Sequence, residues 1–288
     1  MTALRERVSD LLVDGAYGGG WGVVRALPEP VAVRLFDAGA DLTWRRGGKS
    51  VDRLAANLAR VAPGQDLVRA ALRSYARYWR EVFRLQVTPL AQVVGGMRTT
   101  GEPAVRAALA SGRGVVLALP HSGNWDHAGA WCGATGAPFT TVAERLQPAS
   151  LFDRFVSFRE SLGMEVLPLT GGSRPPSAVL VERLEAGGML CLLADRDLSA
   201  RGVDVDFFGS TARMPAGPAA VSLRTGSALV PVTLAFGGPG EWLCTFHDEV
   251  PHTDVATMTQ QVADAFAAGI AAHPQDWHML QKLWLDDL

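Results

Sequence analysis

The sequence predicts an α/β fold, in which a central mixed β-sheet is flanked by helices and preceded by an N-terminal helical part. Two observations support this prediction. From about residue 105 onward, short apolar runs of strand length alternate with longer segments of helical periodicity, which is typical of an α/β domain. Before residue 90, apolar residues recur every three to four positions, as in amphipathic helices. Because no change in composition marks a linker, residues 1–288 are expected to form one domain, helical over 1–90 and α/β over 91–288.

The clearest helix of the N-terminal part covers residues 66–86. One face is apolar and aromatic, and a second stripe at the same spacing consists of Arg69, Arg73, Arg77, Arg80 and Arg84. Such a helix suits a bilayer surface, where the apolar face sinks in and the guanidinium groups meet lipid phosphates. It also suits a core helix with a solvated arginine edge, and the pattern alone leaves both interpretations open.

The elements of the α/β part follow from the same patterns. Strands are expected over Val115–Leu119, Phe139–Ala143, Glu165–Leu169, Met189–Ala194, Val203–Phe208, Leu229–Ala235 and Trp242–His247. Helices are expected over Trp125–Gly133, Pro148–Leu162, Pro176–Ala186, Ala216–Thr225 and Val255–His273. Glycine closes three of these helices, at positions 163, 187 and 226, which is a common helix stop.

Composition narrows the class of protein. Hydrophobic residues make up 48% of the chain and the mean hydropathy is +0.12, although no apolar run reaches membrane-spanning length. We therefore expect a cytoplasmic protein with an unusual amount of apolar surface. The net charge of −2 divides into +6 over residues 1–100 and −8 over the remainder. A basic and apolar N-terminal third predicts an anionic surface as its partner, with solvated helix faces as the alternative.

Several function classes lack the motifs that they need. The three cysteines lie far apart in apolar contexts, so they are interpreted as reduced core residues. His121 and His127 do not have the spacing of a zinc-binding helix, and no metal is expected. Neither a GxSxG elbow nor a GxxxxGK[ST] loop is present, which disfavours a serine hydrolase and an NTPase of that kind. The strand-rich part is acidic and has no basic-aromatic motif, so nucleic acid is not an expected partner.

A histidine follows the apolar run Val115–Leu119 in the turn Pro120-His121-Ser122-Gly123-Asn124, and Asp126 comes five residues after it as a helix opens. Turns at the carboxyl ends of parallel strands are where α/β sheets bind ligands. A histidine with a carboxylate in reach is a general base, because the carboxylate sets the tautomer and stabilises the imidazolium. A turn histidine that caps its own helix would show the same spacing.

Two further segments bear on this site. Asp195 and Asp197 follow the strand 189–194 and would meet His121 at the same edge of a parallel sheet, although caps and ion pairs also explain them. Arg159 lies on the same side of its helix as Phe155 and Leu162, so it is expected to point inward. An inward arginine needs a carboxylate or a phosphate, since guanidinium does not lose its proton.

Five ordered blocks over about residues 90–285 resemble the bacterial late acyltransferases of glycolipid assembly, the superfamily of the lipid A lauroyl and myristoyl transferases. They are His121-Ser-Gly-Asn-Trp-Asp126, Arg159 with Met164-Glu-Val-Leu-Pro-Leu169, Ala194-Asp-Arg-Asp-Leu198, Phe207-Phe-Gly209 with Ala212-Arg-Met214, and Pro274-Gln-Asp-Trp-His-Met-Leu-Gln281. The sequence looks most similar to the actinobacterial phosphatidylinositol mannoside acyltransferases. The His-x4-Asp spacing is a modest signal by itself, and the ordered set is a strong one.

The resemblance implies a peripheral enzyme at the cytoplasmic face of the cell membrane. It would move a long fatty acyl chain, palmitoyl in the mannoside branch, from acyl-CoA to a mannose hydroxyl of a phosphatidylinositol mannoside. No cofactor is implied beyond acyl-CoA as co-substrate, and no covalent acyl-enzyme is expected. The alternatives are the same chemistry on a lipid A precursor or a lysophospholipid, and a non-catalytic peripheral protein that binds lipid.

The resemblance also assigns roles by position. His121 would be the general base, Asp126 occupies the His-x4-Asp position, and Asp195 is the acidic residue of the third block. Either carboxylate could hold the second ring nitrogen of His121. Backbone N–H groups of residues 122–125, which include Asn124 and Trp125, are expected to meet the oxyanion. Trp277 is a plausible wall for an acyl chain, although tail packing explains it equally well. The candidates for binding the coenzyme A phosphates are Arg159, Arg196, Arg201 and Arg224.

Overall fold

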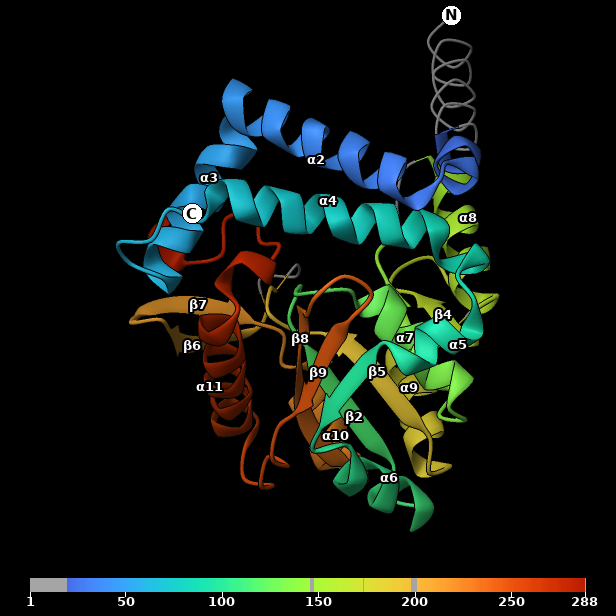
Figure 1. Cartoon of the computed structure of the whole chain (residues 1–288). Coiled ribbons are helices and arrows are strands. Elements are labelled where there is room, and N and C mark those ends of the chain that lie inside the picture. The colour runs from blue at the N-terminus through green and yellow to red at the C-terminus, as the bar shows by residue number, and fades with distance from the viewer. Residues whose placement is uncertain (1–19, 146–147, 173, 198–200, 288) are drawn as a thin grey trace, which may run out of the picture.

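The structure is a computed structural model that describes residues 20–145, 148–172, 174–197 and 201–287. Its centre is a seven-stranded, mostly parallel sheet with helices on both faces, and N-terminal helices lie across one end of it (Figure 1). The predicted α/β class with a mixed sheet is confirmed. Residues 1–19 of the predicted helical part lie outside the described residues.

The N-terminal part is helical, as expected. After a helical segment at residues 20–26 come α2 (Glu29–Arg46), α3 (Lys49–Val61), α4 (Val68–Arg84), the 3-10 turn η1 (Leu85–Val87) and α5 (Leu90–Gly95). Helix α2 lies along α4 on the outside of the molecule (Figure 1). A small apolar core between these helices contains Ala40, Leu54, Leu58 and Leu72.

The sheet has the strand order β1-β9-β8-β2-β5-β3-β4. Its strands are β1 (Met97–Thr100), β2 (Val115–Leu119), β3 (Phe139–Ala143), β4 (Met164–Pro168), β5 (Met189–Leu193), β8 (Ala228–Phe236) and β9 (Trp242–Phe246). Strand β9 runs antiparallel to β8, and all other neighbours are parallel. Strand β2 is buried along its whole length because both faces of the sheet are covered, which explains its unbroken apolar sequence.

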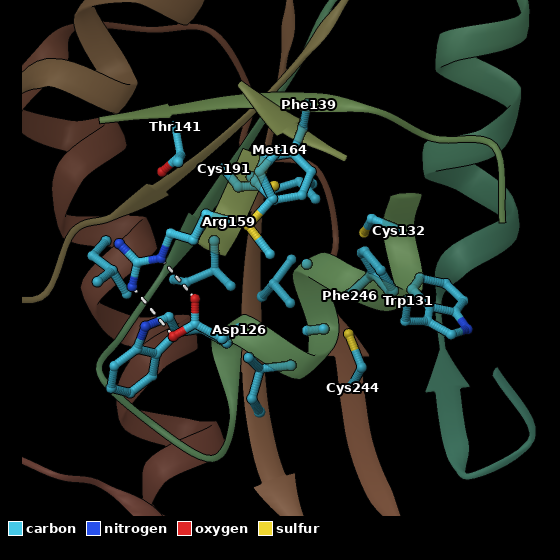
Figure 2. A pocket seen from close by; sticks show the side chains of 18 of the residues that line it. Asp126, Trp131, Cys132, Phe139, Thr141, Arg159, Met164, Cys191, Cys244 and Phe246 are labelled. Atoms are coloured by element: carbon cyan, nitrogen blue, oxygen red, sulfur yellow. Dashed lines mark hydrogen bonds and ion pairs between the residues drawn. The ribbon is translucent and has the colours of Figure 1, made fainter. Parts of the chain in front are cut away.

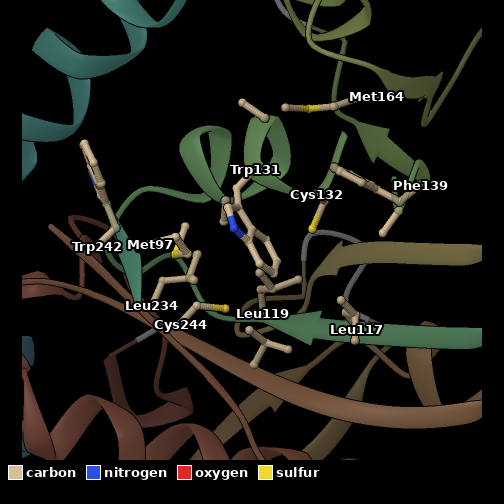
Figure 3. Close-up of a cluster of buried hydrophobic side chains, with 14 of the residues drawn as sticks. Met97, Leu117, Leu119, Trp131, Cys132, Phe139, Met164, Leu234, Trp242 and Cys244 are labelled. Atoms are coloured by element: carbon tan, nitrogen blue, oxygen red, sulfur yellow. The ribbon is translucent and has the colours of Figure 1, made fainter. Parts of the chain in front are cut away.

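Helices cover the sheet on both faces. They are α6 (Glu102–Ala110), α7 (Trp125–Ala134), α8 (Ala149–Glu160), α9 (Pro176–Glu185), α10 (Gly217–Thr225) and α11 (Val255–Ala272), with 3-10 turns η2 (Pro274–Asp276) and η3 (Leu285–Asp287) after them. Because side chains alternate along a strand, Leu117 and Leu119 of β2 enter the core on the α7 side, where Figure 3 shows them near Trp131. Val116 and Ala118 enter the opposite core, which α9, α10 and α11 cover.

The predicted strand 203–208 does not join the main sheet. It forms β6 (Val203–Phe207), which pairs only with β7 (Ser210–Met214) in a separate antiparallel hairpin. Phe208 and Gly209 form the two-residue turn and both have positive φ, at 54° and 73°, as the tight hairpin turn requires. Strands β1 and β7 were not predicted from the sequence, since neither is a continuous apolar run.

Helix α4 is a core helix, and each arginine of its stripe is paired with a carboxylate, although the side chains of Arg69 and Arg73 are still 47% and 41% exposed. Tyr78 and Val82 of its apolar face pack into the main core. Arg69 and Arg73 both bind Asp41 of α2, at 2.6 and 2.7 Å. The other arginines pair with carboxylates in the same way: Arg77 with Glu81, and Arg80 and Arg84 with Glu29. The bilayer interpretation of this helix is therefore wrong.

The outer helix α2 presents apolar side chains to solvent instead. Val31, Leu35 and Leu42 are 47%, 56% and 45% exposed. Their spacing of four and seven residues places them on one face of the helix. None of the helices in the described part of the chain is long and apolar enough to cross a bilayer.

Candidate active site

The candidate catalytic histidine lies at the carboxyl edge of the sheet, just beyond β2. The register of β2 and β5 pairs Leu119 with Leu193, so His121 and Asp195 each lie two residues past a matched pair. Nδ1 of the His121 ring is 2.6 Å from Oδ1 of Asp195. The backbone N–H of His121 also donates to Oδ2 of Asp195, at 2.9 Å. Parallel strand pairing thus joins two residues that are 74 positions apart in the sequence.

Asp195 sets the tautomer of the His121 ring. An ionised carboxylate only accepts hydrogen bonds, so in the neutral form of the ring the proton lies on Nδ1 and Nε2 carries the free lone pair. The indole N–H of Trp277 donates to Oδ2 of Asp195 at 3.0 Å. Burial acts to raise the pKa of Asp195, but the charge and hydrogen bonds of His121 and the Trp277 indole lower it below its ordinary value. With its side chain 30% exposed, His121 is placed to act as a general base toward a bound ligand.

Asp126 has other partners (Figure 2). Nε of Arg159 donates to its Oδ1 at 2.7 Å, and Nη2 donates to Oδ2 at 3.2 Å. The Tyr78 hydroxyl donates to Oδ2 at 2.8 Å. Among the described residues, its hydrogen-bond partners do not include His121. Asp126 therefore ties α7, α8 and α4 together, and Asp195 is the carboxylate in contact with the His121 ring.

Asn124 caps helix α7. Its Oδ1 accepts the backbone N–H of His127 at 2.9 Å, and its Nδ2 donates to Glu81 at 2.8 Å. The Trp125 ring packs on Tyr78 with a centroid separation of 4.1 Å and lies edge-on to His121 at 5.6 Å. Trp125 therefore borders the His121 ring, whereas the side chain of Asn124 is buried and already hydrogen-bonded.

Two of the expected oxyanion donors are already engaged. The Ser122 N–H donates to the carbonyl of Pro120 at 2.8 Å, and the Gly123 N–H donates to the carbonyl of Asp276 at 2.9 Å. The prediction that the whole turn supplies free donors is therefore wrong for these two residues. Gly123 has a φ of 56°, and a Cβ there would come within 2.8 Å of the Leu234 backbone, so no other residue fits.

An apolar cavity opens beside the Asp126–Arg159 pair and extends into the core on the α7 side (Figures 2 and 3). The cavity is narrow, with a volume of about 70 Å³. Among its lining residues are Trp125, Asp126, Leu119, Phe139, Met164, Leu234 and Phe246. The cavity therefore reaches from the catalytic turn into the hydrophobic core.

All three cysteines line this cavity, although they lie far apart in the sequence. They are free thiols. Burial raises the pKa of Cys132 to about 12 and raises the pKa values of Cys191 and Cys244 well above the ordinary value. They therefore remain protonated and act as small apolar groups, in agreement with their interpretation as reduced core residues.

The four arginines proposed for phosphate binding do not lie together. Arg159 is bound to Asp126, so the inward arginine has a carboxylate partner. Arg196 directly follows Asp195 and lines a separate open pocket. Arg201 is exposed ahead of β6. Arg224 lies at the end of α10, which leads into the amino end of β8, so it is at the opposite edge of the sheet from His121. The structure does not bring Arg224 to the candidate site.

Sequence reasoning missed the role of two aromatic residues. Trp277 is completely buried and holds Asp195, and it does not line the cavity. Tyr78 was not singled out in the sequence, and the contact of its hydroxyl with Asp126 was not predicted. A tryptophan inside a block that matched the family was the one available signal for Trp277. Among the described residues, no group of three or more His, Cys, Asp or Glu side chains is arranged to hold a metal ion.

Comparison with known proteins gives the class of the protein. Residues 6–286 match the bacterial lipid A biosynthesis acyltransferase family, so the chain belongs to that family and is an acyltransferase. A relative from Mycolicibacterium smegmatis, named phosphatidylinositol mannoside acyltransferase, is 52% identical over 285 residues, covering 96% of this chain and 93% of the relative. A protein of the same name from Mycobacterium tuberculosis is 50% identical over 299 residues, covering 99% of this chain and 92% of the relative. The resemblance seen in the five sequence blocks is confirmed.

Proposed function

We propose that the protein transfers a long acyl chain, palmitoyl, from acyl-CoA to a mannose hydroxyl of a phosphatidylinositol mannoside at the cytoplasmic face of the cell membrane. The observation that carries the proposal is the His121–Asp195 pair beside an apolar cavity that leads into the core. The names of the two relatives support the acceptor.

In the proposed reaction, Nε2 of His121 takes the proton of the sugar hydroxyl while that oxygen attacks the thioester carbonyl. Asp195 stabilises the imidazolium that forms. The tetrahedral intermediate then expels the coenzyme A thiolate, which takes the proton from His121, so the base is regenerated. With the amides of Ser122 and Gly123 engaged, the turn donors assigned to the oxyanion are those of Asn124 and Trp125, where α7 begins.

The environment of Ser122 supports direct transfer without an acyl-enzyme. The side chain is buried, and its Oγ accepts the backbone N–H of Leu234 at 3.3 Å. A nucleophilic serine needs an exposed hydroxyl within reach of its base. The apolar cavity is assigned to the acyl chain, because its lining offers contact with CH₂ groups and its thiols stay neutral.

The exposed apolar face of α2 supports a peripheral membrane location. Val31, Leu35 and Leu42 share one face of the helix, and Arg45 and Arg46 stand in its last turn. Apolar residues on an outer helix with basic residues at its end suit the boundary between headgroups and acyl chains of an anionic leaflet. We assign this role to α2 in place of α4.

Release of free thiol from palmitoyl-CoA by the purified protein, with and without phosphatidylinositol mannoside, tests the proposal. The expected result is release that depends on the acceptor and is lost in His121→Ala. His252→Ala is the matched control, since His252 bonds to Ser222 and Ser227 near the amino end of β8. Release that ignores both the acceptor and His121 contradicts the proposal. A lipid A precursor and a lysophospholipid, run in parallel, test the alternative acceptors.

A further inference from the structure

A second pocket lies against the same edge of the sheet, between the start of α3 and the C-terminal segment. It is open to solvent, and its lining residues are Lys49, Ser50, Asp52, Arg53, Ala56, Arg196, Leu280, Gln281 and Lys282. Arg196 is the residue after Asp195, so the pocket begins one residue from the carboxylate that holds His121. It is separate from the apolar cavity, with which it shares no lining residue.

The pocket is rich in unpaired positive charge. Arg53 is bound to Asp287, at 2.7 Å. The side chains of Lys49, Arg196 and Lys282 form no ion pair or hydrogen bond with another described residue, and Asp52 is the one carboxylate among the lining residues that the structure describes. The contrast with α4 is informative, since five arginines there all have carboxylate partners. Both lysines of the protein are in this pocket. Cations that converge without partners in a concave site favour an anion from outside the chain.

The start of α3 adds backbone donors to the same pocket. The helix is 13 residues long and is preceded by Gly47 and Gly48, with positive φ values of 64° and 115° that suit glycine. Gly48 is the N-cap residue, so no capping side chain occupies the first amides. Lys49 and Ser50, the first two residues of the helix, both line the pocket. An uncapped helix start with a lysine and a hydroxyl in its first turn is suited to a phosphate group.

We infer that this pocket binds a phosphate group of a substrate, held by Lys49, Lys282, Arg196 and the first turn of α3. The inference rests on the proposed function, because both substrates of that reaction carry phosphate. One source is coenzyme A, through its 3′-phosphate or diphosphate, and the other is the phosphodiester of the glycolipid acceptor. Either source would anchor the charged part of a substrate one residue away from the catalytic pair, while the acyl chain lies in the separate apolar cavity.

Binding measurements without turnover test the inference. The variants are Lys49→Gln/Lys282→Gln and, separately, Arg196→Gln. The matched control is Arg98→Gln/Arg113→Gln, which removes two exposed positive charges on β1 and ahead of β2. Titration calorimetry with coenzyme A, with dephospho-coenzyme A and with micelles of phosphatidylinositol mannoside gives the affinities. Circular dichroism melts confirm that each variant is folded.

We expect the pocket variants to bind one substrate at least about tenfold more weakly than the control does, because a charged hydrogen-bond partner is removed. If the variants weaken binding of coenzyme A but not of dephospho-coenzyme A, the pocket holds the 3′-phosphate. If coenzyme A and dephospho-coenzyme A both bind more weakly, the pocket holds the diphosphate. If only the glycolipid binds more weakly, the pocket holds the phosphodiester of the lipid. Affinities equal to those of the control for all three ligands overturn the inference. Because no step of this test requires acyl transfer, it can fail or succeed independently of the proposed reaction.

Discussion

Asp195 and Asp126 are both buried at the same edge of the sheet, yet they have different partners. Asp195 contacts a histidine ring and an indole N–H. Asp126 contacts a guanidinium and a phenol. Imidazole gains and loses a proton near neutral pH, whereas guanidinium keeps its protons. A carboxylate on an imidazole can therefore support proton transfer, and a carboxylate on a guanidinium stabilises the packing of helices.

The two hydrogen-bond partners of Asp126 keep fixed protonation states. Burial acts to lower the pKa of Arg159, but the Asp126 carboxylate raises it above its ordinary value. Burial and Asp126 raise the pKa of Tyr78 well above its ordinary value, so its proton stays on the hydroxyl. Arg159 therefore stays charged and the Tyr78 hydroxyl stays neutral. This comparison predicts that changes at Asp195 affect the reaction and that changes at Asp126 affect the fold.

The largest expected effect is the loss of activity in Asp195→Asn and His121→Ala. Loss of a positioned general base costs about 10²–10⁴-fold in rate. Asparagine has the shape of aspartate but cannot stabilise imidazolium, so Asp195→Asn should fall in the same range. Initial rates of thiol release from palmitoyl-CoA with saturating acceptor measure the effect.

The double variant His121→Ala/Asp195→Asn is the control for that prediction. If the two residues act as one unit, the double variant loses no more activity than His121→Ala alone. Losses that multiply would contradict the joint role of the pair and return Asp126 to consideration as the partner of His121.

The sequence predicted the edge of the sheet where the site lies, but the choice between the two aspartates needed the structure. Which strands are neighbours is a long-range property, and the β2–β5 pairing that joins His121 to Asp195 spans 74 residues. The sequence left both Asp126 and Asp195 open as the partner of the His121 ring. The turn, however, places Asp126 in the first turn of α7, where it faces α8 and α4.

Sequence patterns within one helix or strand predicted the features that depend on that element alone. The direction of Arg159 was predicted from its own helix, whereas its partner, a carboxylate rather than a phosphate, depends on how α8 packs against α7. The strand at 203–208 was predicted, but its position outside the sheet depends on the turn at Phe208 and Gly209. Pairing of Arg69 and Arg73 with Asp41 could not be predicted either, because Asp41 lies on another helix, 28 and 32 positions away.

The next largest effect concerns stability at the other aspartate. Asp126→Asn should lower the free energy of unfolding by about 3–5 kcal/mol, because it leaves the buried guanidinium of Arg159 without its counter-charge. Urea denaturation measures the change. Asp126→Asn/Arg159→Met removes both charges and should recover part of the loss. A double variant as unstable as the sum of the single variants would show that the pair is not coupled.

Tyr78→Phe is expected to have a smaller effect on the same cluster. It removes one hydrogen bond to a charged carboxylate and keeps the ring that packs on Trp125, so the loss should be about 1.5–3 kcal/mol. The rate of thiol release per folded molecule should stay near that of the unchanged protein. A rate loss as large as that of Asp195→Asn would assign Tyr78 and Asp126 to the reaction itself.

The smallest expected effect is a pH dependence that separates the charge of Asp195 from its shape. The folded-state pKa of Asp195 is lowered, so its contribution to stability is present above the unfolded pKa of about 3.9 and is lost as pH falls through the folded value. The difference in unfolding free energy between the unchanged protein and Asp195→Asn should therefore shrink as pH falls below about 4. Burial alone acts to raise this pKa, and His121 is the largest opposing influence. The same measurement is then made on His121→Ala and on the double variant His121→Ala/Asp195→Asn. The difference between their unfolding free energies should no longer shrink below about pH 4. If that difference still shrinks, Trp277 and the backbone N–H lower the pKa of Asp195 without His121. The contact with His121 would then position the ring but would not stabilise the carboxylate charge.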